Sequence, residues 1–331
     1  MPQVDLPLEE LTEYRGSSPC PVDFDQYWQR ALTELHRMEA HGFSAQWEPA
    51  AFSIPALGVR CMDLYFTGTM GARIHARVVL PGLQPDGQPH QGLLKFHGYT
   101  MNAGEWASLL PLAAGGCVVA AMDVRGQGGE STDPGGAGGN THRGHIIRGV
   151  EGAPEDLFYR HVFMDTAILA RIILAHNEVD PRQVATFGAS QGGALALACA
   201  ALEPRISRVL GIYPFLSDYR RVWEMEGGDS AYEELRYYLK RRDPRHQRID
   251  QFFLRLGYID VVNLARWITV PVTMVTGLMD SRCPPSTQFA LYNNLAGPRQ
   301  HILYPDFGHE TLPDMQDIIL QWALEGNAEL K

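Results

Sequence analysis

One stretch of the chain, residues 184–198, reads VATFGASQGGALALA. It begins with a short apolar run, passes through the pattern Gly-x-Ser-x-Gly and ends in an alanine-rich run typical of a helix. A serine on a very tight strand-to-helix turn projects its Oγ above the sheet, and only small residues fit at Gly188 and Gly192. Ser190 is therefore the candidate nucleophile. The alternative is a glycine-rich connection that only packs, but the position between a strand and a helix favours the nucleophile.

A serine hydroxyl needs a base to take its proton and an acidic group to orient that base. Both partners are expected downstream of Ser190, at the carboxyl ends of later strands, where active-site groups collect in α/β sheets. Asp280 follows the predicted strand 270–276 and is the candidate acid. His309 follows the predicted last strand 301–304 and is the candidate base.

Other residues compete for these two roles. His301 also lies downstream of Asp280, but it stands at the beginning of its strand and so at the wrong end of the sheet. Asp306 is close to His309 in sequence, yet a residue three positions away in a tight loop more often makes a turn. Glu310 is expected to shape the loop or to begin the following helix, where a carboxylate near the N-terminus is favourable. We therefore prefer Asp280 and His309.

Attack on an ester creates an oxyanion that needs preorganised N–H donors. In this arrangement the donors are the backbone N–H after the nucleophile and one from the loop after an early strand. The first donor is the N–H of Gln191, after Ser190. The second is assigned to the N–H of Tyr99, because residues 93–96 form a predicted buried strand and the loop follows it. His97 begins that loop, upstream of the nucleophile, and is expected to be a hydrogen-bonded structural histidine.

The rest of the chain predicts an α/β fold. Apolar positions recur at helical spacing over residues 23–39 and predict an amphipathic helix. Three alternating or β-branched runs then predict antiparallel strands, and later apolar runs alternate with helical segments, as in parallel βαβ units with both sheet faces covered. This order matches the α/β-hydrolase fold, a mostly parallel central sheet with helices on both faces. The predicted strands are 47–54, 59–66, 73–80, 93–96, 117–122, 184–187, 209–212, 270–276 and 301–304.

Two segments interrupt this alternation. Residues 126–144 are rich in glycine and small polar residues and predict a long ordered loop. Residues from about 217 to 267 predict a helical insertion near the active site. We expect a single α/β-hydrolase domain over residues 1–331, with an N-terminal helical extension over residues 1–45. The helices predicted within the insertion are 232–240, 249–256 and 261–267.

The composition argues against several partner classes. The chain of 331 residues has a formal net charge of −10 and only short basic stretches, which argues against nucleic acid or an anionic membrane as a partner. The first residues contain no positively charged and apolar leader, and nowhere do about 18 apolar residues follow one another. We therefore expect a soluble cytoplasmic protein.

Neither a cofactor nor a metal site is expected. Five cysteines without a C-x-x-C spacing favour reduced thiols over disulfides or structural zinc. Cys283 lies three residues after Asp280, so its thiol is able to approach the site, although an inert buried thiol is the commoner case. His142 and His145 would share one face of a helix, but the glycines around them favour a loop. Residues 125–129 lack the G-K-[ST] of a phosphate-binding loop.

Six motifs are spread over nearly the whole chain: DLPLEEL (5–11), FHGY (96–99), RGQGG (125–129), GASQGG (188–193), PPST (284–287) and GHE (308–310). Together they resemble the family of acetyl xylan esterases and cephalosporin C deacetylases, carbohydrate esterase family 7. The resemblance implies a catalytic triad and two oxyanion donors, formed by Ser190, Asp280, His309, Tyr99 and Gln191. It also implies deacetylation of short acetylated xylo-oligosaccharides and of cephalosporin C, by a cytoplasmic homohexamer whose inward-facing entrances exclude polymeric xylan. The segment 217–260 departs most from the family pattern, so the resemblance says least about substrate range.

The leading hypothesis is a serine carboxylic ester hydrolase that acts on small acetylated substrates through an acyl-enzyme intermediate. A broader short-chain esterase or a peptidase of the same fold is the alternative. Peptidases of this fold often carry a large additional propeller, for which this chain has no room. A catalytically inactive binding module is the third hypothesis, and the presence of all three candidate triad residues disfavours it.

Overall fold

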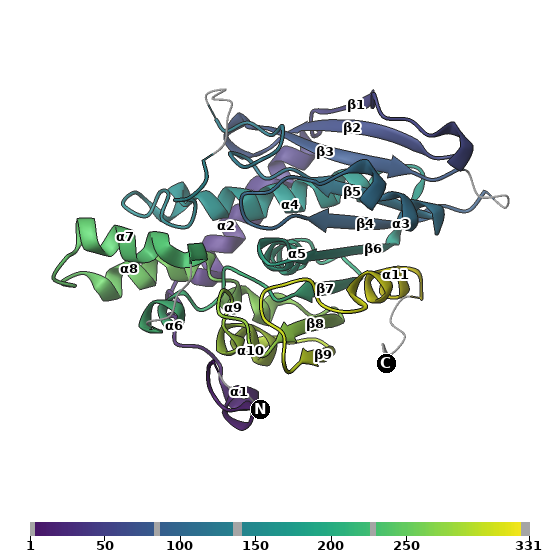
Figure 1. Cartoon of the computed structure of the whole chain (residues 1–331). Helices are drawn as coiled ribbons and strands as arrows, with labels where there is room; N and C mark the ends of the chain where they lie inside the picture. Colours follow the sequence, from purple (N-terminus) through teal and green to yellow (C-terminus); the bar gives the residue numbers. More distant parts are fainter. Residues whose placement is uncertain (1–3, 83–86, 135–140, 226–229, 326–331) are drawn as a thin grey trace.

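A nine-stranded sheet runs through the part of the chain that the computed structural model describes, residues 4–82, 87–134, 141–225 and 230–325 (Figure 1). The strand order is β1-β2-β3-β5-β4-β6-β7-β8-β9. Strands β1, β2, β3 and β5 pair antiparallel, and every pair from β5 through β4 to β9 is parallel. The strands are β1 Ala45–Pro49, β2 Arg60–Thr67, β3 Arg73–Leu80, β4 His90–Phe96, β5 Cys117–Met122, β6 Val179–Ala189, β7 Arg208–Ile212, β8 Val272–Gly277 and β9 Arg299–Tyr304.

Helices cover both faces of this sheet (Figure 1). Leu94 and Ala120 belong to the core shared with α2, α4, α5, α9 and α10, whereas the neighbouring Leu93 and Val119 face α3 and α11. This alternation is the period of two that a strand covered on both faces produces. The chain therefore has the α/β-hydrolase fold. The helices are α1 Leu8–Glu13, α2 Phe24–Ala40, α3 Leu110–Ala114, α4 Phe158–Leu174, α5 Gln191–Leu202, α6 Tyr219–Glu224, α7 Glu233–Arg242, α8 Ile249–Leu256, α9 Val261–Leu264, α10 Pro285–Asn294 and α11 Met315–Glu325.

The helix α5 lies at the centre of the molecule and is buried along its whole length, as is α4 beside it. Its residues are almost all alanine, leucine and glycine, so it has no polar face to present to water. A helix that is apolar all round is stable only when other elements surround it. Helix α5, which begins directly after Ser190, is therefore packed against other elements on every side.

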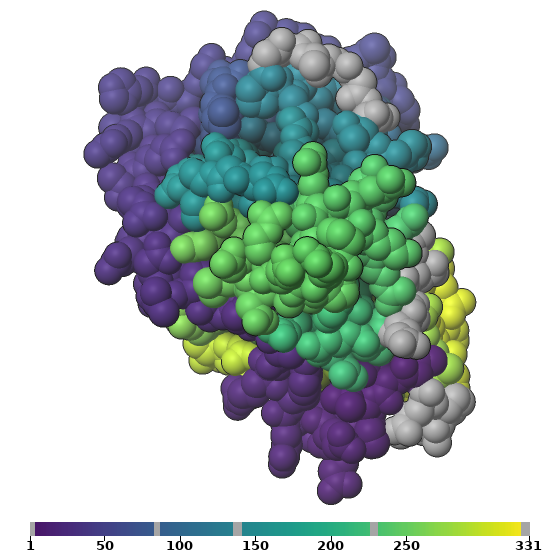
Figure 2. Space-filling model, turned by 90° about the vertical axis from the view of Figure 1, so that its left-hand side faces the viewer, coloured from purple at the N-terminus to yellow at the C-terminus, as the bar shows by residue number. Residues whose placement is uncertain are grey.

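The helices α6 to α9 form the insertion between β7 and β8. Helices α7 and α8 lie side by side at the left of Figure 1, where Tyr238 stacks on Phe252 with ring centroids 4.6 Å apart. Seen from that side, the insertion covers the middle of the face and the N-terminal segment lies beside it (Figure 2). The two are joined through Asp218, whose carboxylate accepts hydrogen bonds from the N–H groups of Ser17 and Ser18.

Most predicted elements are present, with differences at their ends. The first strand was predicted over 47–54 but ends at Pro49, and Pro55 begins a 3₁₀ turn, because proline has no N–H to donate to a ladder. The helix predicted over 261–267 is a short α-helix followed by the 3₁₀ turn Ala265–Trp267. Helix α1 was not predicted. No helix or strand occurs in the described part of the loop 126–144, as predicted, while residues 135–140 lie outside the described residues.

None of the helices in the described ranges combines the length and the apolar character that crossing a bilayer requires.

Candidate active site

Ser190 occupies the turn between β6 and α5. Its φ of 58° and ψ of −122° place it in the left-handed half of backbone space, where a residue other than glycine is strained. The turn is tight because a Cβ on Gly192 would lie 2.0 Å from the carbonyl oxygen of Phe96. A Cβ on Gly188 would lie 2.6 Å from the same oxygen. Only glycine fits at both positions, so the turn is pressed directly against the end of β4.

The structure brings Ser190, Asp280 and His309 together. His309 Nδ1 lies 2.8 Å from Asp280 Oδ2, and His309 Nε2 lies 3.1 Å from Ser190 Oγ. The Asp280 carboxylate is fully buried, and its other oxygen accepts hydrogen bonds of 2.8 Å from the N–H groups of Arg282 and Cys283. A carboxylate in this position can hold the proton of an imidazole on Nδ1, an arrangement in which Nε2 presents its lone pair to the hydroxyl of Ser190.

The competing residues lie elsewhere or act differently. His301 Nε2 lies 2.8 Å from Thr276 Oγ1, and burial lowers the pKa of His301 to about 3. Asp306 is exposed. Glu310 accepts a hydrogen bond of 3.0 Å from the N–H of Gly308, five residues before α11 begins. Glu310 therefore shapes the loop and does not begin the helix.

The loop after β4 carries Tyr99 and contacts the turn at Ser190. The side-chain amide of Gln191 donates to the carbonyl oxygen of His97 at 3.3 Å, which joins the two segments. The N–H of Gln191 lies in the first turn of α5, where no intrahelical acceptor exists. His97 is a structural histidine, as predicted: its Nδ1 donates to the carbonyl oxygen of Gly98 and its Nε2 accepts from the N–H of Val124. Burial lowers the pKa of His97, consistent with a neutral ring.

Two glutamines and a tyrosine, Gln127, Gln191 and Tyr159, form a buried group of hydrogen bonds next to this loop, which we call the amide network. The amides of Gln127 and Gln191 bond reciprocally, at 2.8 and 3.0 Å. The Tyr159 hydroxyl donates to Gln191 Oε1 at 2.7 Å, and Gln127 Oε1 accepts from the N–H of Thr100 at 2.9 Å. Gln127 therefore connects the residue after Tyr99 to the residue after Ser190.

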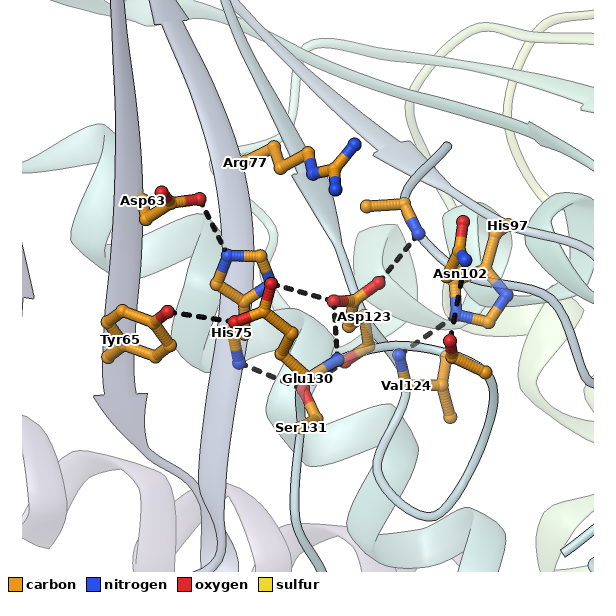
Figure 3. A network of polar contacts seen from close by, with 12 residues as sticks. Asp63, Tyr65, His75, Arg77, His97, Asn102, Asp123, Val124, Glu130 and Ser131 are labelled. Carbon is orange, nitrogen blue, oxygen red and sulfur yellow. Dashed lines mark hydrogen bonds and ion pairs between the residues drawn. The ribbon is translucent and has the colours of Figure 1, made fainter. Parts of the chain in front are cut away.

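A second network contacts the same loop farther along the chain, at the N–H of Ala103 (Figure 3). The ionic network consists of Asp63, His75 and Asp123. His75 Nδ1 lies 2.7 Å from Asp123 Oδ2, and its Nε2 lies 3.0 Å from Asp63 Oδ1. Asp123 also accepts hydrogen bonds from the N–H groups of Ala103 at 2.6 Å and Glu130 at 2.9 Å.

The ring of His75 in this network faces a carboxylate at each nitrogen. Two carboxylate acceptors require a proton on both nitrogens, so the ring is an imidazolium. Burial lowers the pKa of His75, but the hydrogen bonds to Asp123 and Asp63 and the negative charges of Asp123 and Glu130 together raise it more, so the net shift is upward. The ionic network therefore holds a buried positive charge between two negative ones.

The insertion reaches the same loop through Glu234 of α7. One of its carboxylate oxygens accepts from the Tyr99 hydroxyl at 2.5 Å. The other accepts from the N–H groups of Ile146 and Ile147, at 2.7 and 3.1 Å. The ring of Tyr99 also packs on Phe215, with centroids 5.3 Å apart. The side chain of Tyr99 is thus a link between the loop after β4 and the insertion.

Sequence reasoning missed several residues of the site. Tyr213 lies directly after β7, and its ring packs on His309 with centroids 4.6 Å apart. Its position at the carboxyl end of a parallel strand was a usable signal. Cys283, whose approach to the site its spacing from Asp280 had suggested, is fully buried there. Burial and then the Asp280 charge raise the pKa of its thiol, and a hydrogen bond with Ser190 offsets this only in part. Glu234 and Gln127 carried no comparable signal.

The two histidines considered for a metal lie outside helices and strands, as expected. His145 is buried, its Nε2 lies 2.7 Å from the carbonyl oxygen of Thr141, and its ring packs on Phe158. His142 is exposed.

A mostly parallel sheet and a serine on a tight strand-to-helix turn, followed in chain order by Asp280 and His309, define the class of protein as an α/β-hydrolase. Within that class, the model of the protein family described as acetyl xylan esterase (AXE1) matches residues 1–325 of this chain. The chain belongs to the acetyl xylan esterase family.

Two solved structures are similar over nearly the whole chain. Acetyl xylan esterase 1 from Thermoanaerobacterium sp. JW/SL YS485 is 48% identical, with a TM-score of 0.91, and the match covers 98% of this chain and 100% of that one. Acetyl xylan esterase from Paenibacillus sp. R4 is 33% identical, with a TM-score of 0.88, and the match covers 96% of this chain and 99% of that one.

A curated relative matches over a shorter span. Acetyl esterase Axe7A from Xylanibacter ruminicola is 27% identical over 184 residues, which is 54% of this chain and 39% of that protein. The matched region therefore spans about two fifths of that relative.

Proposed function

We propose that the protein is a serine carboxylic ester hydrolase that removes acetyl groups from small acetylated substrates. Ser190 is the nucleophile, His309 the general base and Asp280 the group that orients it. The observation that carries this proposal is the position of His309, 2.8 Å from Asp280 and 3.1 Å from Ser190, with Ser190 on a strained turn. These are hydrogen-bonding distances, as a nucleophile and its base require.

The reaction follows from this geometry. His309 Nε2 takes the proton of Ser190 as Oγ attacks the acetyl carbonyl carbon, and the N–H groups of Tyr99 and Gln191 stabilise the oxyanion. The C–O bond to the alcohol breaks, His309 returns the proton to the leaving alkoxide, and acetyl-Ser190 remains. Water, deprotonated by His309, then attacks this ester. The bond from the acyl carbon to Ser190 Oγ breaks, His309 returns the proton to Oγ, and the acetic acid released ionises to acetate. Asp280 stays ionised and stabilises the imidazolium that forms in each half of the reaction.

The family supports the acetyl group as the acyl group. The solved relatives at 48% and 33% identity are both described as acetyl xylan esterases, and the curated relative is described as an acetyl esterase. We propose acetylated xylo-oligosaccharides and cephalosporin C as substrates. The insertion contacts the loop of Tyr99 through Glu234, so it is the segment expected to shape the alcohol side of the pocket.

Treatment with a serine-directed sulfonyl fluoride tests the nucleophile. We expect mass spectrometry to find the label on Ser190, and Ser190→Ala to lower kcat by at least about 1,000-fold. Ser108→Ala, at an exposed serine shortly before α3, is the control and should keep the wild-type rate. A label on another residue, or full activity in Ser190→Ala, would contradict the proposal.

Initial rates against acyl chain length test the acetyl assignment. We expect rates on one leaving group to fall steeply beyond acetyl or propionyl, since a small pocket excludes longer chains. A flat profile would instead indicate a broad short-chain esterase, and faster turnover of peptide anilides than of acetyl esters would indicate a peptidase. A correctly folded protein without turnover on any small ester would indicate a binding module.

The cytoplasmic location and the homohexameric assembly implied by the family resemblance stay predictions. Sedimentation at assay concentrations would test the assembly, and a monomer would contradict it.

A further inference from the structure

Three potential metal ligands of different chemistry meet at the proposed triad. Among the described residues, Asp280, Cys283 and His309 form the one set of three or more such side chains whose ligand atoms all lie within 4.8 Å of one another. They comprise a carboxylate oxygen, a sulfur and an imidazole nitrogen. Proteins bind Zn²⁺ through these donor types, and thiolate in particular selects soft cations.

The ligand atoms of the three groups lie within 4.8 Å of one another, a wider spacing than that of ligands already bound to one ion. Ordinary zinc–ligand distances place two ligands of one ion about 3.4–3.6 Å apart. The loop that carries Asp280 and Cys283 is already held, because one oxygen of Asp280 accepts the N–H groups of Arg282 and Cys283. The other oxygen faces His309. We therefore expect the three side chains to move closer together when one ion binds them all.

We propose that Asp280, Cys283 and His309 form an inhibitory site for soft divalent cations, represented by Zn²⁺ and Cd²⁺. Binding forms metal bonds to sulfur, nitrogen and oxygen, and the thiol proton is released to solvent. The thiolate and the carboxylate neutralise the two charges of the ion. The side chain of His309 is 14% exposed, whereas those of Asp280 and Cys283 are buried, so the ion enters from the His309 side.

Coordination at this site removes the base. If the ion binds Nε2, the lone pair facing Ser190 is occupied. If it binds Nδ1, the ring proton moves to Nε2, which again cannot accept the Ser190 proton. Inhibition rests on the proposed role of His309, whereas binding of the ion does not.

Direct titration with Cd²⁺ tests binding without reference to activity. We expect wild-type protein in a metal-free, non-chelating buffer to bind one Cd²⁺ per chain and to develop the ultraviolet charge-transfer absorption of a cadmium thiolate. Cys283→Ala should lose this absorption. Cys20→Ala, which removes an exposed thiol, is the matched control and should keep it. Should Cys283→Ala fail to fold, His309→Asn provides the second variant and should weaken Cd²⁺ binding at least about 10-fold.

Inhibition is measured on the same proteins. We expect Zn²⁺ to inhibit wild type and Cys20→Ala reversibly, with activity restored by a chelator, and to slow labelling of Ser190 by the sulfonyl fluoride. Relative to its own uninhibited rate, Cys283→Ala should require at least about 10-fold more Zn²⁺ for half-inhibition.

The outcomes separate the two proposals. Absence of Cd²⁺ binding in the wild type, or a thiolate absorption that persists in Cys283→Ala, overturns the metal site and leaves the esterase mechanism in place. Stoichiometric binding at Cys283 without inhibition overturns the inhibitory role and counts against His309 as the base.

Discussion

The loop that carries Tyr99 is held by two buried networks of opposite character. The amide network of Gln127, Gln191 and Tyr159 consists of neutral groups, whereas the ionic network of Asp63, His75 and Asp123 holds an imidazolium between two carboxylates. The neutral network adjoins the proposed oxyanion donors. Neutral amides keep their hydrogen bonds across a wide pH range and place no fixed negative charge beside a developing oxyanion. We therefore expect a change of pH to affect the ionic network and to leave the amide network unchanged.

The largest expected effect is on the ionic network. Asp123→Ala leaves the buried His75 imidazolium and the N–H groups of Ala103 and Glu130 without their acceptor. We expect the free energy of unfolding to fall by about 3–5 kcal/mol, measured by urea titration. Asp63→Asn changes the other partner of His75, whose side chain is 24% exposed. We expect this variant to lower the free energy of unfolding by about 1 kcal/mol. Equal losses from the two variants would contradict this account of the network.

The amide network is expected to affect rate more than stability. Gln127→Ala removes the acceptor of the Thr100 N–H and one partner of Gln191. We expect kcat to fall about 10- to 100-fold with KM little changed, because the loop that carries a proposed oxyanion donor shifts. The control is Asn102→Ala, an exposed amide on the same loop, which should change kcat less than about twofold. A rise in KM without loss of kcat would argue against a role in positioning the oxyanion donors.

The charge on His75 predicts a pH dependence that the amide network lacks. The folded pKa of His75 is raised above its ordinary value, so its contribution to stability is complete below the unfolded pKa of about 6.5. That contribution is lost as the pH rises through the folded pKa. The difference in unfolding free energy between wild type and His75→Gln should therefore shrink with increasing pH above about 6.5. Urea titrations at several pH values measure this difference, and a constant or growing one would show that the ring is neutral.

The smallest expected effect on stability comes from a surface ion pair. This pair lies next to Glu234, which contacts the loop that carries Tyr99. Arg143 and Glu233 form an ion pair with side chains 57% and 56% exposed. Arg143→Ala should change the unfolding free energy by less than about 0.5 kcal/mol. The neighbouring Glu234 is buried and accepts three hydrogen bonds, so Glu234→Gln should cost about 1–3 kcal/mol. Urea titrations that rank these variants in the opposite order would contradict the assignment of Glu234 as a link.

The positions of the proposed catalytic residues could be predicted because each depends on a local rule. The glycines around Ser190 report a turn with no room for side chains. Asp280 and His309 each follow a strand of a parallel sheet, and parallel strands end at one common edge. The topology therefore brings the two loops together, and the loop conformations set the distance of 2.8 Å between the side chains.

The supporting residues could not be predicted in the same way. Gln127 bonds to Gln191, 64 residues away in the chain, and to Thr100, 27 residues away. Neither the spacing nor the position of a glutamine in the sequence indicates which residue its side-chain amide will bind. The spacing of Cys283 from Asp280 suggested that the thiol was near, but only packing decided that it is buried against the site.

The sequence by itself determined the fold class, the order of the candidate catalytic residues and the family, because hydrophobic period, glycine-dependent turns and strand-end positions are encoded over a few residues. Only the tertiary structure decided which buried polar groups support the loop that carries Tyr99, how the insertion reaches Tyr99, and that a thiol completes the proposed set of metal ligands. The physical reason is that a buried hydrogen-bonding group takes whichever partner the packing of distant segments places within reach.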